Sequence, residues 1–120
     1  MQLTVRNLIE NSALKIKLIN KNSNIDKKVI WAHTSELANP SEWVQPYSLI
    51  MTTGLGIPKH ADEQKNYIQR IIDAELSTLL ISDNMSAPDD LSALLEIADK
   101  YDFPICYIVY HTPFREVIKL

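Results

Sequence analysis

Three short apolar runs, separated by two amphipathic segments, constrain the fold of this 120-residue chain more than any other feature. The apolar runs are residues 47–52, 77–81 and 103–109. Between them, residues 60–76 and 88–98 place apolar side chains at spacings of three and four, which is typical of a helix with one buried face. Continuously apolar strands are covered by helices, and strand–helix–strand units cross over right-handedly. The pattern therefore predicts a βαβαβ core with a parallel sheet.

The first part of the chain predicts one short helix and two further strands. Thr4 precedes apolar residues that share one helical face, so its hydroxyl can cap that helix. Residues 14–19 alternate apolar and basic side chains, the period of a half-buried strand, and residues 28–33 predict a second strand. An Asn-rich turn at 20–24 separates them, and we expect a hairpin. The expected fold class is α/β: a single domain with a small, mostly parallel sheet flanked by helices, plus an N-terminal strand pair.

Length and charge limit the classes of function. A chain of 120 residues with 46% hydrophobic content is the size of one domain, and it contains no repeat that would divide it. Its net charge is −3, and its one adjacent basic pair is Lys27-Lys28. Nucleic-acid binders usually carry a clustered basic face. We therefore do not expect this segment itself to contact DNA.

The single cysteine and the absence of long apolar runs bear on the compartment. Cys106 lies within an apolar run, where one thiol forms no internal disulfide and behaves as a small buried hydrophobe. No apolar run approaches the roughly 20 residues of a membrane-spanning helix, and the first residues do not resemble a secretion signal. We expect a cytoplasmic protein without membrane contact.

The turn Thr52-Thr53-Gly54-Leu55-Gly56, which follows the first core strand, is the best candidate for a ligand site. In parallel α/β sheets, ligands bind beyond the carboxyl ends of strands. Two glycines at this spacing lack the third glycine of a dinucleotide fingerprint, and no Gly-Lys-Ser/Thr follows, which excludes Rossmann and P-loop interpretations. Two interpretations stay open: a loop that contacts a ligand, or a tight turn with a purely structural role.

A loop rich in turn signals, residues 34–46, precedes that strand and adds Ser35, Glu36 and Trp43 to the candidate site. Its prolines exclude a long helix. Trp43 can line a pocket or an interface, where Trp is enriched, or it can anchor the loop.

Catalytic and metal-binding chemistry have weak support. His33 lies near Ser35 and Glu36, and an imidazole can activate a hydroxyl, but no Gly-x-Ser-x-Gly elbow accompanies it. The three histidines occupy separate segments without a second ligand at i+4, so no metal site or cofactor is expected. Asp89 and Asp90 suit the first turn of a helix better than a phosphoacceptor pocket.

Three motifs in succession carry a family resemblance: Trp-Ala-His-Thr-Ser-Glu-Leu at 31–37, Asn-Pro-Ser-Glu-Trp-Val at 39–44, and Ser-Leu-Ile-Met-Thr-Thr-Gly at 48–54. This series resembles the amino-terminal domain of purine catabolism regulatory protein-like (PucR-type) bacterial transcriptional regulators. Ala-Asp at 98–99, Phe-Pro-Ile at 103–105 and Pro-Phe at 113–114 extend the resemblance over nearly the whole chain.

The resemblance implies that residues 1–120 form a non-enzymatic regulatory domain, placed ahead of a helix-turn-helix domain that binds DNA. Residues 113–120 start a helix whose apolar pattern is still running, as expected for a linker helix in a longer regulator. We expect an unidentified small-molecule effector and a homodimer. The expected ligand-binding residues are His33, Ser35, Glu36, Trp43, Thr52, Thr53 and Gly54. The alternatives are a dimerisation or docking module without a ligand, and a small enzyme.

Overall fold

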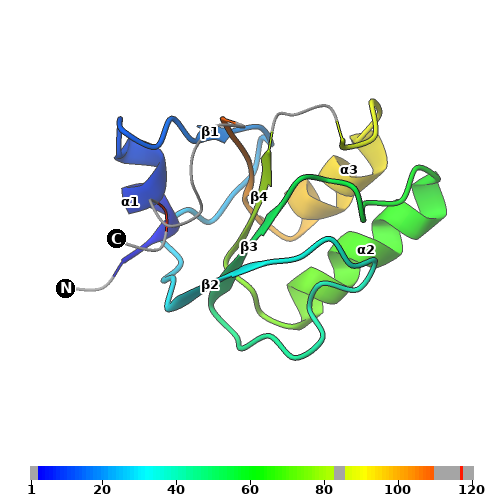
Figure 1. The fold of residues 1–120 in the computed structure, drawn as a ribbon, viewed down its shortest axis with the longest axis horizontal. Helices are drawn as coiled ribbons and strands as arrows, with labels where there is room; N and C mark the ends of the chain where they lie inside the picture. The colour runs from blue at the N-terminus through cyan, green and yellow to red at the C-terminus, as the bar shows by residue number, and fades with distance from the viewer. Residues whose placement is uncertain (1–2, 83–85, 110–116, 118–120) are drawn as a thin grey trace.

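The computed structural model describes residues 3–82, 86–109 and 117, and it contains one five-stranded sheet with helices on both faces (Figure 1). The strands lie in the order β1-β5-β4-β3-β2. The four strands β2 to β5 are parallel, and β1 joins β5 in the antiparallel sense. In chain order the elements are α1 (Val5–Glu10), β1 (Lys17–Leu18), β2 (Trp31–Thr34), β3 (Ser48–Thr52), α2 (Ala61–Asp73), β4 (Thr78–Ser82), α3 (Ser92–Lys100) and β5 (Ile105–Ile108).

The predicted βαβαβ core is confirmed as β3-α2-β4-α3-β5. Successive parallel strands lie side by side, so each crossover advances in the same direction across the sheet. Crossovers of one hand and one direction place their helices on one face. Accordingly, α2 and α3 cover one face of the sheet, and α1 lies on the other (Figure 1).

The alternation of side chains along the buried strands divides the core between the two faces. The α2/α3-face core contains Ile50, Leu79, Ile81 and Ile105 from the strands, packed with apolar residues of both helices. The α1-face core includes Leu49, Met51, Leu80, Cys106 and Ile108 from the strands, with Val5, Leu8, Leu14, Ile16, Val29 and Val117. Both faces of the central strands are therefore buried, which explains why those strands read as continuous apolar runs.

The expected N-terminal hairpin is wrong, although both of its segments contain a strand. β1 and β2 lie at opposite edges of the sheet. Asn20 gives the physical reason, because its amide donates to the Phe103 carbonyl at 2.8 Å and accepts from the Ile105 amide at 2.9 Å. The Asp99 carboxylate also accepts two backbone N–H bonds from the following turn. These contacts attach the turn to the β5 edge and prevent local pairing.

The starts of the helices differ in how well they were predicted. Thr4 caps α1 as expected: its hydroxyl accepts from the Asn7 amide, and the Asn7 side chain accepts from the Thr4 amide. Asp89 and Asp90, however, precede α3 rather than lying in its first turn, because the helix begins at Ser92. The Asp90 carboxylate still accepts the Ser92 amide at 2.9 Å.

The expected linker helix at 113–120 lies outside the described residues except for Val117, whose side chain is buried. No helix in the described part of the chain is both long enough and apolar enough to cross a membrane.

Candidate functional site

The candidate site lies at the carboxyl ends of β2 and β3, where two loops meet. The turn 53–58 follows β3, and the loop 35–47 follows β2. Because the two strands are parallel neighbours, with Thr34 beside Met51, their carboxyl ends lie at the same edge of the sheet. The structure therefore brings together the two loops that the sequence analysis assigned to one candidate site.

Glu36 joins the two loops through its carboxylate. One carboxylate oxygen accepts the hydroxyls of Thr52 and Thr53, each at 2.8 Å, and the other accepts the Thr53 backbone N–H at 2.9 Å. The Thr52 hydroxyl oxygen in turn accepts the Gly54 N–H at 3.0 Å. Four of the expected site residues, Glu36, Thr52, Thr53 and Gly54, therefore form one hydrogen-bonded group.

The two glycines of the turn allow close approach of neighbouring backbone. Gly54 has a φ of +91°, and a Cβ atom there would lie 2.4 Å from the Cβ atom of Ala87. A Cβ atom on Gly56 would lie 2.3 Å from the carbonyl oxygen of Glu36. The turn is thus packed against the loop that follows β4 on one side and against the loop that follows β2 on the other.

Ser35 and His33 do not form a nucleophile–base pair. The Ser35 hydroxyl accepts the Leu37 amide at 3.2 Å, and the Ser35 amide donates to the Met51 carbonyl. His33 Nε2 is buried and has no hydrogen-bond partner among the described residues. The geometry of these two side chains gives no support to an enzymatic interpretation.

Two further buried polar atoms, Tyr67 Oη and Ser48 Oγ, also lack a partner within the described ranges. Burial, with a smaller contribution from the Glu36 carboxylate, raises the pKa of Tyr67 well above its ordinary value. The hydroxyl of Tyr67 therefore stays protonated at any physiological pH.

Trp43 is separate from the hydrogen-bonded group. Its side chain is 90% exposed, and its backbone has a φ of +69°, a conformation that side-chain-bearing residues rarely adopt. Leu37 and Leu55 are also exposed in the two loops, and Ile30 and Trp31 are exposed at the opposite, amino end of β2. This exposure excludes the interpretation of Trp43 as a buried loop anchor, and its part in a ligand site or an interface stays a prediction.

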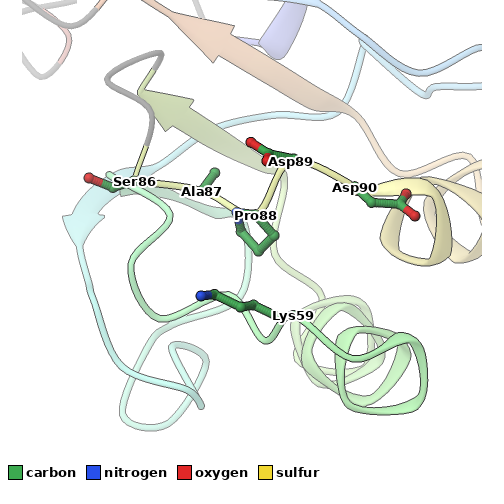
Figure 2. A pocket seen from close by; sticks show the side chains of 6 residues that line it. All are labelled: Lys59, Ser86, Ala87, Pro88, Asp89 and Asp90. Carbon is green, nitrogen blue, oxygen red and sulfur yellow. The ribbon is translucent and has the colours of Figure 1, made fainter.

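A cavity of about 380 Å³ adjoins the turn and was not predicted from the sequence (Figure 2). It is connected to the candidate site through Ala87, which contacts Gly54. Figure 2 shows Lys59 on one wall and residues 86–90 on the other, with the carboxylates of Asp89 and Asp90 directed away from Lys59. Its lining residues are Lys59, Ser86, Ala87, Pro88, Asp89 and Asp90.

The order of strands and helices in the sequence could have predicted the position of this cavity. The rule that loops meet at the carboxyl edge of a parallel sheet applies to the loop after β4 as well as to the loop after β3.

Hydrogen bonds from Ser92 lower the pKa of the exposed Asp90 carboxyl, which lines this cavity, so Asp90 is ionised at neutral pH. Within the described ranges, no three His, Cys, Asp or Glu side chains gather as metal ligands would.

The fold and this edge define the class: an α/β domain with a polar, loop-built site beyond the carboxyl ends of its parallel strands. The chain belongs to the purine catabolism regulatory protein-like family, whose model matches residues 7–120. It is also 37% identical over 115 residues to the transcriptional activator PmfR of Paenarthrobacter nicotinovorans. That match covers 96% of this chain and 24% of PmfR, so the chain spans about a quarter of that relative's length.

Proposed function

We propose that this chain is a non-catalytic, cytoplasmic sensory domain of a bacterial transcriptional regulator. In this proposal a small metabolite binds at the carboxyl edge of the sheet and controls a helix-turn-helix domain that lies outside these 120 residues. Control of this kind requires that the metabolite bind two states of the regulator with different affinity. DNA contact belongs to that other domain, in keeping with the net charge of −3.

The observation that carries the proposal is membership of a regulatory family over residues 7–120. The similarity to a transcriptional activator supports the same role, and the shorter length of this chain fits one domain of such a regulator. The site itself adds support, since threonine hydroxyls, backbone amides and a neighbouring cavity all lie at one edge of the sheet.

A thermal-shift screen against purine catabolites, amino acids, polyamines and short carboxylates tests the sensory role. A ligand at 100 times its dissociation constant stabilises a protein by roughly 2.7 kcal/mol. For a domain of this size we expect Tm to rise by roughly 8 to 10 °C. Thr53→Ala should abolish the shift, whereas replacement of Asn66, an exposed residue of α2, should not.

Regulation in the cell gives the second measurement. A reporter driven by the full-length regulator should lose its response when Thr53→Ala is introduced. An unchanged response in both Thr53→Ala and Trp43→Ala would contradict a sensory role for this edge of the sheet.

A dimerisation or docking module is the second candidate, and the exposed apolar residues favour it. Trp31 is 62% exposed on the edge strand β2, and Trp43 is 90% exposed in the adjoining loop. Large aromatic side chains are frequent energetic centres of protein interfaces. Analytical ultracentrifugation would show a mass that rises with concentration in the absence of ligand, and Trp31→Ser should shift that equilibrium toward the monomer.

A further inference from the structure

We infer that the Thr52–Thr53 turn is a carboxylate-binding site that the chain fills with its own Glu36, and that a small organic carboxylate can take the place of Glu36. This inference rests on the proposed function and names the chemical class of its ligand. Exchange of one carboxylate for the other would release the loop that carries Trp43.

The donors of the turn are arranged for a carboxylate. Two hydroxyls and one backbone N–H reach both oxygens of Glu36 at 2.8 to 2.9 Å. The Thr52 hydroxyl donates its one proton to Glu36, since a carboxylate oxygen can only accept, while the hydroxyl oxygen accepts the Gly54 N–H. Donors that contact an ionised acceptor make the stronger class of hydrogen bond. The site therefore selects a ligand with two adjacent acceptor oxygens.

No Lys or Arg side chain pairs with Glu36 among the described residues. In the described part of the chain the one ion pair joins Arg6 to Asp26, so Glu36 is held by neutral donors alone. An incoming carboxylate that displaces Glu36 therefore replaces one negative charge by another at the same donors. Glu36 is also exposed, so a solute can reach the donors without opening the core.

Glu36 is the hydrogen-bonded attachment of its loop. Within residues 36–46, the other hydrogen bonds join loop residues to one another or to Ser35, at Leu37, Ser41 and Val44. The Glu36 carboxylate thus supplies the hydrogen bonds between this part of the loop and the described remainder of the chain. Loss of those bonds leaves the loop held by packing, and its exposed Trp43 free to change position.

Chemical rescue with acetate tests whether the turn binds a carboxylate. Glu36→Ala removes the internal ligand and leaves the donors in place, so sodium acetate should raise the Tm of this variant in a saturable manner. Sodium chloride of equal ionic strength is the salt control. Glu42→Ala removes an exposed glutamate from the same loop and should show no acetate effect beyond that of salt. The double variant Glu36→Ala/Thr53→Val, which lacks one donor, should lose the rescue.

An acetate shift in Glu36→Ala no larger than that in Glu42→Ala would overturn the inference. NMR gives a measurement that does not depend on stability: acetate should move the Thr53 amide resonance of Glu36→Ala more than that of the unmodified chain. Resonances that move only elsewhere would also overturn it.

Competition in the unmodified site is tested with Glu36→Gln, which keeps the side-chain shape but weakens the internal acceptor. A carboxylate found in the thermal-shift screen should bind this variant at least about tenfold more tightly than the unmodified chain. An effector that binds Glu36→Gln and the unmodified chain with equal affinity would overturn the exchange of Glu36 for a ligand carboxylate, but it would still support the sensory function. Acetate rescue of Glu36→Ala without any effector from the screen would support the carboxylate site and count against the sensory function.

Discussion

Gly54 combines a left-handed backbone with the contact that joins the turn after β3 to the loop after β4. Its φ of +91° is accessible to glycine at little cost, and a Cβ atom would lie 2.6 Å from the backbone Cα of Ala87. The clash is with backbone, so a rotamer change elsewhere cannot relieve it. The residue therefore fixes both the shape of the turn and the position of a wall of the cavity.

We expect Gly54→Ala to lower the free energy of unfolding by about 2 to 4 kcal/mol, from overpacking and left-handed strain together. Leu55→Ala is the matched control, since that side chain is 72% exposed in the same turn and should change stability by no more than about 0.5 kcal/mol. Urea denaturation measures both variants. Equal stability of the two would contradict this account of the turn.

Cys106 links stability to alkaline pH. Burial raises the pKa of its thiol from 9.0 to about 11, with a small opposing effect of Thr78, whose hydroxyl lies 3.9 Å from the sulfur. The neutral thiol is favoured in the folded state, so its contribution is complete below pH 9 and is lost as pH rises toward 11. This shift of the pKa corresponds to a loss of up to about 3 kcal/mol in unfolding free energy.

Comparison with Cys106→Ala isolates this effect from other groups that titrate at high pH. The unmodified chain should lose more unfolding free energy between pH 8 and pH 11 than the variant does, as measured by urea denaturation at each pH. Parallel pH profiles would show that the thiol does not carry the effect.

At the scale of elements, Gln64 holds three segments together from the first turns of α2. Its side chain is 1% exposed. Its amide nitrogen donates to the carbonyls of Pro58 and Asp90, each at 2.9 Å, and its oxygen accepts the Leu94 amide at 3.1 Å. One buried amide thus joins the turn after β3, the segment before α3 and α3 itself.

Gln64→Leu keeps the approximate volume but removes the partner of one buried and two partly buried backbone groups. We expect a loss of about 2 to 4 kcal/mol in unfolding free energy, since each unsatisfied buried group costs about 1 to 3 kcal/mol and neighbouring water offsets part of it. Gln69→Ala, which removes an exposed side-chain contact to Asp73 on the same helix, should cost far less. Thermal unfolding of the two variants gives the comparison.

The elements that sequence predicted well are those whose pattern is local. Apolar periodicity identified the three core strands, which are buried on both faces of the sheet, and the two crossover helices, which each bury one face against it. The wrong hairpin depended on a contact that no local pattern contains: Asn20 binds the backbone of Phe103 and Ile105, more than 80 residues away in the sequence. Long-range side-chain hydrogen bonds of this kind decide which edge of a sheet a strand joins.

The candidate site was predicted in its position and in part of its membership. Thr52, Thr53, Gly54 and Glu36 meet as the loop argument implied. The hydrogen bonds among these residues were not predictable, because the contact of the Glu36 carboxylate with the two threonines depends on the path of the loop between them. The exposure of Trp43 and the cavity wall at Lys59 likewise depend on how the loops pack. Ligand binding by these residues stays a prediction.

At the scale of the whole molecule, one sheet divides two cores, and β4 contributes to both. Leu79 lies in the α2/α3-face core and Leu80 in the α1-face core, and their exposures are 0% and 1%. The two cores share every central strand, so neither can unfold while the other stays intact. We therefore expect a single cooperative unfolding transition.

Leu79→Ala and Leu80→Ala form a matched pair for that expectation. Each should shift the same transition and cost about 2 to 5 kcal/mol, the usual range for truncating a buried leucine. Far-UV circular dichroism and tryptophan fluorescence should give coincident curves for both variants. Separate transitions in Leu80→Ala alone would show that the α1 side unfolds independently.

Val5 and Val117, from opposite ends of the described chain, share the α1-face core, and β1 pairs with β5. A ribosome releases residues in order, at roughly 5 to 20 per second. The early side chains Val5 and Leu8 can pack with the apolar residues between Leu14 and Met51 as these emerge, but their core partners in β4 and β5 follow only later. A nascent chain halted before β5 would leave part of that apolar core uncovered, which makes the emergence of β5 from the ribosome the step that closes the core.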